Sequence, residues 1–344
     1  MKTVEDKFEN FNMEGKILIC YHKEDNDGVF SGALLYNYCV YNLQCEKEDI
    51  VLLGLNYNES KSINSKTLKA WREVYNHLFI TDFSLPIPLM KRAHKLWGNC
   101  FLWFDHHKPV IEASMRSSAG KLCECRGERC IDRSAILCVY KYLYDPFDSD
   151  RLDNPNNIPE LLRILSGWDS FTYEKEGFTL DYVRKVNYGI THLFNLDIIE
   201  VARALQFNDK DDMERLKNRA YNVGKILVDD ENIRMANIIK NSGDMDWKIE
   251  DSEGHIRTAC AIFNEGPSNS QMFDSVKDKV TNGIVFKRNS DGTWTVSLYN
   301  INDKDTWHVG NFCREKYKGG GHQGAAGFQI KQSKMIALLR SKTL

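Results

Sequence analysis

The chain has 344 residues, of which 27% are charged and 42% are hydrophobic, and this length predicts two domains. Its formal net charge of −2 argues against a protein that coats duplex nucleic acid, and no uncharged apolar run is long enough to span a membrane. The acidic, polar stretch from Met1 to Gly15 is unlike a secretory signal peptide, so we expect a cytoplasmic protein.

Three short apolar runs in the first half of the chain each lead into a polar cluster. They cover residues 16–21, 77–81 and 100–104, and helices are expected between them over 29–43 and 86–96. Continuous apolar runs separated by helices are typical of a parallel α/β sheet. Ligands of such sheets bind beyond the carboxyl ends of the strands, where all three polar clusters fall.

The rest of the chain is helical first and β-rich afterwards. Helices are expected over 134–143 and 158–166, and an almost continuous helical segment over 196–241. From about residue 246 the expected elements are strands at 257–263, 282–287 and 293–299 with a hairpin turn at 290–292, a glycine-rich loop at 319–321, a strand at 328–330 and a final helix.

The expected fold class is therefore α/β, in three parts. An N-terminal parallel-sheet domain covers residues 1–195, and a helical connector covers 196–245. A smaller C-terminal mixed-sheet α/β domain covers 246–344.

The ten cysteines are expected to be free thiols, because a reducing compartment disfavours disulfides. Cys123, Cys125 and Cys130 form a C-x-C-x4-C pattern that matches zinc spacings poorly. Two interpretations stay open: a structural metal site, or incidental thiols on a loop or strand edge, which the spacing favours.

The first polar cluster runs from His22 to Gly28 and contains Asp25 and Asp27. Alternate carboxylates on an extended loop project in different directions, so each can serve a different metal ion. Taken alone, the cluster is more typical of an Asx-rich turn with a helix N-cap than of a metal site.

Three further clusters follow the later elements: Asp82 after the second run, Asp105-His106-His107 after the third, and Asp169 after a helix. Each is weak or moderate as a signal, since a single aspartate at such a place is more often a cap or a turn residue. Together they add carboxylates and imidazoles on one face, and this set suits Mn²⁺, Mg²⁺ or iron rather than thiolate-bound zinc.

Charge balance favours two divalent ions at this face. Four aspartates carry −4, which two M²⁺ ions neutralise, whereas without metal the carboxylates would raise one another's pKa. Two such ions can share one carboxylate and one bridging hydroxide, an arrangement used for phosphoryl hydrolysis.

The last cluster runs from Gly319 to Gly327 and contains His322. Glycines let backbone N–H groups converge on an anion, and a histidine can donate to a phosphate. The structural alternative, a flexible turn before a strand, is equally compatible with the glycines.

The ordered motifs HKEDNDG, TDFS, DHH, GWD and GGGHQGAAGF resemble the DHH phosphoesterase superfamily with a DHH-associated C-terminal domain. They span residues 22–328, so the resemblance covers nearly the whole chain. The family includes nanoRNases and oligoribonucleases, RecJ exonucleases, cyclic-dinucleotide phosphodiesterases, manganese pyrophosphatases and exopolyphosphatases. The helical connector and the GGGH domain resemble most the nanoRNase and phosphodiesterase branch.

The resemblance implies a role for each matching residue. One metal would be held by His22, Asp25 and Asp82, and the other by Asp27, Asp82, His106 and Asp169, with Asp82 bridging. Asp105 would hold the DHH loop in place, and His107 would stabilise the scissile phosphate or protonate the leaving oxygen. Gly320, Gly321 and His322 would bind the phosphate or nucleotide across an interdomain cleft.

Two departures from the family pattern concern the site. Only two residues separate His22 from Asp25, where many members have three, so Glu24 is a competing ligand. The last strand lacks an arginine that relatives often place there, and Arg288 and Arg314 are candidates to replace it.

We therefore expect a manganese-dependent phosphodiesterase that cleaves short single-stranded RNA or linear dinucleotides to nucleoside 5′-monophosphates, with no membrane partner and with a homodimer as an open alternative. The aromatics Trp168, Phe171 and Tyr173 could stack a base, although a core role is favoured for them. Alternative functions are hydrolysis of a cyclic dinucleotide, of pAp or of polyphosphate, or binding of nucleotides without catalysis.

Overall fold

We describe a computed structural model of the chain. It describes residues 15–116, 122, 124–144, 158–206, 210–251, 253–266, 268–301, 307–321 and 323–344. The chain forms two compact units, Met1–Val228 and Asp229–Leu344. The boundary lies inside one long helix, and the three-part division of the sequence analysis stays a prediction.

The first unit contains a four-stranded parallel sheet with the strand order β2-β1-β3-β4. Its strands are β1 (Ile17–His22), β2 (Ile50–Leu55), β3 (His77–Thr81) and β4 (Phe101–Phe104). The three predicted apolar runs are β1, β3 and β4, and β2 is an additional edge strand. The α/β class and the parallel sheet are confirmed.

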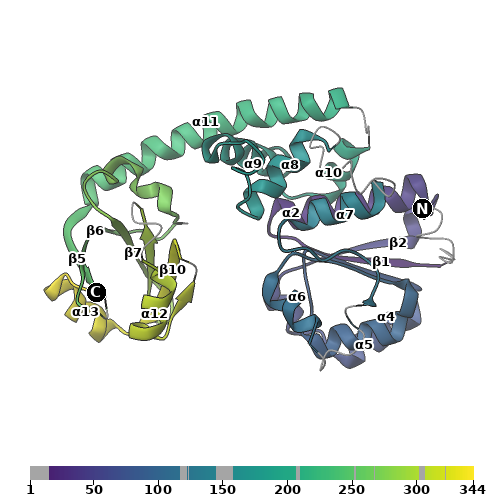
Figure 1. Cartoon of the computed structure of the whole chain (residues 1–344), viewed down its shortest axis with the longest axis horizontal. Coiled ribbons are helices and arrows are strands. Elements are labelled where there is room, and N and C mark those ends of the chain that lie inside the picture. Colours follow the sequence, from purple (N-terminus) through teal and green to yellow (C-terminus); the bar gives the residue numbers. More distant parts are fainter. Residues whose placement is uncertain are drawn as a thin grey trace. The chain divides into compact units, whose positions relative to one another are not determined.

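Helices cover both faces of this sheet, as Figure 1 shows for α2 and α7 on one side and α4, α5 and α6 on the other. Alternate residues of β1 feed two cores: Ile17 and Ile19 join one apolar cluster, and Leu18 and Cys20 join the other. The helices of this unit are α2 (Asn26–Asn37), α3 (Tyr57–Ser60), α4 (Ser65–Val74), α5 (Ile87–Trp97), α6 (Lys108–Ser114), α7 (Ala135–Tyr144), α8 (Glu160–Asp169), α9 (Leu180–Phe194) and α10 (Ile198–Leu205).

Several helix ends differ from the sequence expectation. The helix expected over 29–43 begins earlier, at Asn26, because Asp25 caps it, and its last part is a π-helical turn (Tyr38–Asn42). The helix expected over 158–166 continues to Asp169, so this aspartate belongs to the last turn of α8 instead of following it. Short 3₁₀ turns lie at Lys47–Asp49 and Gly98–Cys100.

The second unit contains a mixed six-stranded sheet with the order β5-β6-β7-β8-β10-β9. Neighbours are antiparallel except β6 and β7, which are parallel. The strands are β5 (Asp244–Glu250), β6 (Ile256–Phe263), β7 (Asn282–Arg288), β8 (Trp294–Asn300), β9 (Gly320–Gly321) and β10 (Ala325–Ile330). The predicted hairpin between β7 and β8 is present, with Gly292 at φ +80° in its turn.

Two apolar clusters also sandwich this second sheet. One contains side chains of α12 (Val309–Tyr317) and α13 (Gln332–Ser341), and the other contains side chains of α11 and of a 3₁₀ segment (Ser270–Val276). The helix α11 (Lys210–Ser242) is 33 residues long, and together with α10 it accounts for the helical segment expected over 196–241.

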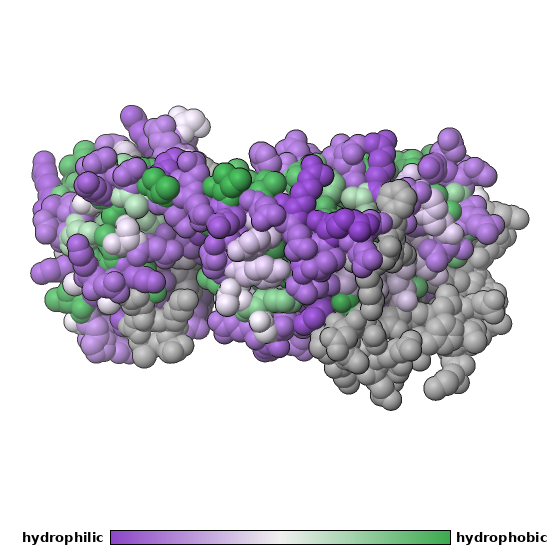
Figure 2. All heavy atoms as spheres, turned by 90° about the horizontal axis from the view of Figure 1, so that it is seen from above, coloured by the Kyte–Doolittle hydropathy of each residue, from purple (hydrophilic) through white to green (hydrophobic). Residues whose placement is uncertain are grey.

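The face shown in Figure 2 is mainly hydrophilic, with separate small apolar patches. In the described part of the chain, no helix combines the length and the apolar character needed to cross a membrane.

Candidate metal centre

The predicted site residues of the first unit converge at the carboxyl edge of the parallel sheet. His22 ends β1, Asp82 follows β3, and the segment from Asp105 to His107 follows β4. Because β1 and β4 both flank β3, these three chain segments are neighbours. The last turn of α8 adds Asp169, whose carboxylate lies 3.1 Å from the His106 ring.

The two aspartates of the first motif have different surroundings. Asp25 is the N-cap of α2: one carboxylate oxygen accepts from the Gly28 N–H at 2.9 Å, and the other lies 2.9 Å from His22 Nδ1. The capping interpretation is therefore correct for Asp25, and it coexists with a position beside His22. A Cβ on Gly28 would lie 2.0 Å from the His22 carbonyl oxygen, so close packing of α2 against β1 requires glycine here.

Asp27 has a structural role that the sequence analysis missed. Its carboxylate, 2% exposed, accepts from the backbone N–H groups of Ala135 and Ile136, each at 2.8 Å. These are free N–H groups at the start of α7, where a carboxylate is favoured by the helix dipole. One of its oxygens also lies 3.5 Å from Nε2 of His106.

Asp82 lies at the centre of the cluster. Its backbone has φ +51°, a left-handed conformation that is uncommon for residues other than glycine and that aspartate tolerates better than most. The turn directs one carboxylate oxygen to within 3.6 Å of His22 Nδ1 and the other to within 3.2 Å of His106 Nε2. Asp82 thus faces both histidines with different oxygens, as a shared ligand would.

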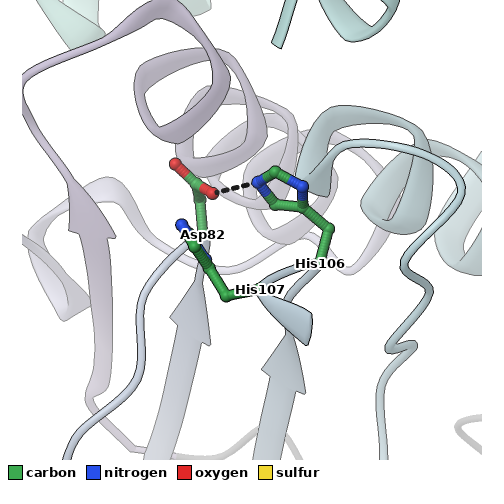
Figure 3. Close-up of side chains that lie close together, drawn as sticks. All are labelled: Asp82, His106 and His107. Carbon is green, nitrogen blue, oxygen red and sulfur yellow. Dashed lines mark ion pairs between the residues drawn. The ribbon is translucent and has the colours of Figure 1, made fainter. Parts of the chain in front are cut away.

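Nε2 of His106 is surrounded by three carboxylates. Asp169 lies at 3.1 Å, Asp82 at 3.2 Å and Asp27 at 3.5 Å from this nitrogen. Figure 3 shows the His106 ring pointing at Asp82, with His107 next to it on the same loop. One imidazole nitrogen carries at most one proton, so Nε2 of His106 can donate to only one of these three carboxylates at a time.

The crowding of carboxylates changes their acidity. Burial and the charge of Asp27 raise the pKa of Asp82 well above its ordinary value. Burial and the charge of Asp27 also raise the pKa of Asp169, to about 8. Both aspartates therefore hold protons, in the absence of cations, at a pH where ordinary carboxyl groups have lost them.

His22 and Asp25 form the opposite case, an ion pair. Burial opposes the charge on His22, but hydrogen bonds to Asp25 and Asp82 outweigh it and raise the pKa of His22 to about 10. Burial likewise opposes the charge on Asp25, but the hydrogen bonds from His22 and Gly28 lower its pKa. Glu24 is exposed and lies 3.9 Å from Nε2 of His22. Glu24 and Asp25 are therefore both within reach of the His22 ring.

The described residues fit metal ions. Three groups place ligand atoms within 4.8 Å of one another, and Asp82 belongs to two of them: His22, Asp25 and Asp82; Asp82, His106 and His107; Asp27, His106 and Asp169. Buried oxygens of Asp82 and Asp169 have no hydrogen-bond partner among the described residues. Oxygen and imidazole donors of this kind suit Mn²⁺ or Mg²⁺, and cations would relieve the repulsion that raises the carboxyl pKa values.

His107 has a separate hydrogen-bond system. Its Nδ1 lies 2.8 Å from Asp105, a fully buried carboxylate that also accepts from the His107 backbone N–H and from the Trp103 indole N–H. Burial opposes the Asp105 charge, but the bonds from His107 outweigh it and lower the pKa of Asp105. An ionised Asp105 therefore keeps the Nδ1 proton in place and fixes the ring.

Tyr57, which belongs to none of the sequence motifs, lies beside His22 and His107. Its hydroxyl lies 3.3 Å from His107 Nε2, and its ring centroid lies 5.4 Å from that of His22. Tyr57 begins α3 directly after β2, so prediction of that strand would have placed it at the same sheet edge.

The predicted substrate-binding loop lies in the second unit. Gly320 and Gly321 form β9, which pairs with β10, and His322 lies outside the described residues. Gly321 has φ +145° and no room for a Cβ, whereas a Cβ on Gly320 would meet open space. The fold therefore requires glycine at position 321 but would accommodate a side chain at position 320.

The three aromatics after the last aspartate divide into two groups. Trp168 and Tyr173 are partly buried and pack against the core of the first unit, as the structural alternative expected. Phe171 is 82% exposed and has φ +55°, so it has no core role. A bulky residue in this backbone conformation is uncommon and costs free energy.

The cysteine pattern contributes no ligand among the described residues. The described groups able to hold a metal contain neither Cys125 nor Cys130. Cys123 lies outside the described residues.

No protein-family model matches the sequence, and no curated protein matches it. Several solved structures are similar to this chain at low sequence identity. The pGpG-specific phosphodiesterase PggH from Vibrio cholerae matches with 14% identity and a TM-score of 0.49, over 95% of this chain and 97% of that chain.

Two further matches have a similar extent on this chain. An exopolyphosphatase-related protein from Bacteroides fragilis is 13% identical with a TM-score of 0.47, over 98% of this chain and 95% of that one. RecJ from Thermus thermophilus, in complex with Mn²⁺, is 14% identical with a TM-score of 0.46, over 98% of this chain and 53% of that one.

Proposed function

We propose that this chain is a metal-dependent phosphodiesterase that hydrolyses short RNA oligonucleotides or linear dinucleotides to nucleoside 5′-monophosphates. One observation carries the proposal: four aspartates and two histidines meet at one sheet edge, beside a histidine oriented by a buried carboxylate. The residues are Asp25, Asp27, Asp82, Asp169, His22 and His106, with His107 and Asp105 next to them.

Two divalent cations fit this cluster, most simply Mn²⁺. His22, Asp25 and Asp82 would hold one, and Asp27, Asp82, His106 and Asp169 would hold the other. When bound, such cations lower the pKa of water and neutralise phosphoryl oxygens. Bound cations would also explain why the folded protein keeps carboxylates at distances that raise their pKa.

The residues of the chain supply the rest of the reaction. His107, oriented by Asp105, would donate a proton from Nε2 to the leaving 3′-oxygen, or hydrogen-bond the charged phosphate. Glycines 320 and 321 and His322 would bind a phosphate or nucleotide of the substrate through backbone N–H groups and an imidazole. The net charge of −2 suits a short substrate better than a long duplex.

A panel of substrates tests the proposal directly. Purified protein with Mn²⁺ is incubated with labelled dinucleotides, 5-mers, 24-mers, cyclic dinucleotides, pAp and polyphosphate, with the His106→Ala protein as control. We expect dinucleotides and 5-mers to be cleaved fastest and chelation to stop the reaction. Faster cleavage of a cyclic dinucleotide, pAp or polyphosphate would replace the proposed substrate, and tight nucleotide binding without turnover would indicate a binding module.

A further inference from the structure

The helix that begins at Tyr57 is held in place by polar contacts to the first polar cluster, His22 to Gly28. Asn56 donates from its side chain to Glu24 at 2.9 Å, and Lys23 forms an ion pair with Glu59 at 2.5 Å. These two contacts fasten the short helix that begins at Tyr57 onto the loop that follows β1. The position of Tyr57 is thus set by the same loop that carries the predicted ligands.

The Tyr57 ring lies among three site residues. Its centroid is 5.4 Å from that of His22, 5.7 Å from Phe83 and 6.0 Å from His107. The ring meets His107 at 86°, edge to face, and the hydroxyl oxygen lies 3.3 Å from Nε2 of His107. Tyr57 is nevertheless 44% exposed, so one side of it faces solvent and any bound substrate.

Tyr57 completes a chain of hydrogen bonds through His107. Asp105 accepts from the Nδ1–H of His107 and from the Trp103 indole, so the Nδ1 end of the ring is fixed from below. Because the neutral ring then has its lone pair on Nε2, the Tyr57 hydroxyl donates to it. Both nitrogens of the imidazole are therefore held, and the ring has one orientation.

We propose that Tyr57 is a positioning residue for His107, and that its hydroxyl keeps Nε2 where the leaving oxygen of the substrate takes up a proton. The inference deepens the proposed function and rests on it. Of the two residues that contact the His107 ring, Asp105 is fully buried and Tyr57 is exposed. The substrate therefore approaches His107 from the side of Tyr57.

His107 serves the step in which the phosphodiester bond breaks. The oxygen of water bonds to phosphorus, and the bond from phosphorus to the leaving oxygen breaks with its electron pair on that oxygen. Protonated His107 gives its Nε2 proton to the leaving oxygen, the proton of the attacking water passes to solvent, and solvent reprotonates the ring. While Nε2 is protonated, the Tyr57 oxygen accepts from it until the leaving oxygen replaces the hydroxyl.

The dependence on the leaving group tests this role. Tyr57→Phe keeps the ring and removes the hydroxyl, and Tyr41→Phe is a matched control because Tyr41 is also 44% exposed. On a dinucleotide, whose leaving alkoxide needs a proton, we expect kcat to fall roughly tenfold with KM within twofold. On thymidine 5′-(p-nitrophenyl phosphate), whose phenolate leaves without a proton, we expect kcat to be unchanged.

Bound metal, measured by elemental analysis, should be the same in all three proteins. An equal loss on both substrates would indicate a structural role for Tyr57, and no loss on either would remove it from the reaction. In both cases the proposal is wrong. The Tyr41→Phe protein should match the wild type on both substrates.

A spectroscopic measurement separates this proposal from the proposed function. In the Mg²⁺-loaded protein, the ¹⁵N resonance of His107 Nε2, assigned by its loss in His107→Gln, should shift in Tyr57→Phe and not in Tyr41→Phe. If the wild type hydrolyses neither substrate, the proposed function is wrong, and this resonance alone decides whether Tyr57 positions His107. An unchanged resonance overturns the positioning role.

Discussion

The two sheets of the molecule place very different chemistry at their edges. The parallel sheet of the first unit ends in aspartates and histidines, several of them buried, such as Asp82 at 1% exposure and Asp27 at 2%. The mixed sheet of the second unit ends in Gly320 and Gly321, which carry no side-chain charge. Both sheets are nonetheless covered by apolar clusters on two faces.

In both units the apolar clusters stabilise the sheet, whereas the residues at the sheet edge are available for binding. In the first unit, the carboxylates raise one another's pKa, so the metal-free site opposes folding at neutral pH. In the second unit, the edge formed by Gly320 and Gly321, here called the glycine edge, exposes backbone groups at little electrostatic cost. Cations are therefore expected to act on the first sheet, and a bound anion on the second.

The largest effect is expected for His106→Ala. Its Nε2 lies within 3.5 Å of three carboxylates, so its loss removes a ligand from the centre of the cluster. We expect kcat on a dinucleotide to fall by about 10³-fold or more, since bound metal supplies several kcal/mol of charge stabilisation. His255→Ala, in the second unit and 65% exposed at its side chain, serves as the control in the same assay.

Asp27→Asn should lower kcat to a similar extent, and it should also lower the stability of the fold. An amide at this position turns an NH₂ group toward one of the two backbone N–H groups of α7 that the carboxylate now accepts from. The urea midpoint should therefore fall in Asp27→Asn and stay near wild type in His106→Ala. Full Mn²⁺-stimulated activity of either protein would contradict the assigned metal site.

The next prediction concerns the dependence of stability on metal and pH. The chelated protein should become less stable as pH rises from 5.5 to 8, and saturating Mn²⁺ should restore stability most strongly at pH 8. At 100 times its Kd a ligand adds about 2.7 kcal/mol to the free energy of unfolding. Urea unfolding of the full chain at each pH, with and without Mn²⁺, measures both effects.

The expected loss of stability with rising pH follows from the direction of the pKa shifts. Asp169, with a pKa of about 8 against an ordinary 3.8, keeps a proton in the folded state that the unfolded chain loses, so folding is opposed as pH rises through this window. His22 acts in the same direction between 6.5 and about 10. Hydrogen exchange should show protection by Mn²⁺ around residues 22–28 and 105–107 and no change in the strands β6 to β8. Equal protection of both sheets would contradict the expectation that cations act only on the first sheet.

The fold could be predicted from the sequence where the hydrophobic signal was local and strong. The strands β1, β3 and β4 are uninterrupted apolar runs, and β7 and β8 flank a clear turn signal at Gly292. The missed strand β5 alternates apolar Met245, Trp247 and Ile249 with charged residues, a period-2 pattern that its edge position explains. The missed strand β2 is an apolar run as well, and omitting it had a consequence for the site.

The site could be predicted as a set of ligand types but not as a geometry. The motifs identified the aspartates and histidines, because each follows a strand or lies at a helix end. The contact of Asp27 with α7 depends on a helix more than 100 residues away, which local sequence does not reveal. Tyr57 was missed because β2 was missed, since only the pairing of β2 with β1 brings Tyr57 beside His22.

A further prediction tests the edge of the second sheet formed by Gly320 and Gly321. In Gly320→Ala the new methyl group meets open space, so the fold should be unaffected, but a phosphate could no longer approach the backbone closely. We expect KM for a dinucleotide to rise about tenfold, equal to about 1.4 kcal/mol, with kcat and bound metal unchanged. His322→Ala should act in the same direction.

Gly266→Ala is the matched control, because its Cβ would make only an ordinary contact of 3.6 Å with Asn264 in the same unit. If Gly320→Ala and Gly266→Ala have the same kinetics as the wild type, the glycine edge takes no part in substrate binding. A change in bound metal would instead show that this edge influences the site of the first unit.

The smallest effect is expected for Phe171→Ala. Phe171 lies two residues after Asp169, is 82% exposed and has a left-handed backbone, so its ring adds nothing to the core and strains the chain. A base stacked on an aromatic side chain gains about 1–3 kcal/mol, so KM for a dinucleotide should rise about fivefold or more, while kcat on a base-free phosphodiester such as bis-p-nitrophenyl phosphate stays unchanged. Phe171→Tyr should retain the wild-type KM, because it keeps the aromatic face. Equal KM values for the alanine and wild-type proteins would mean that the strained, exposed ring does not contact a base, and that base recognition, unlike metal binding, is not located at this end of α8.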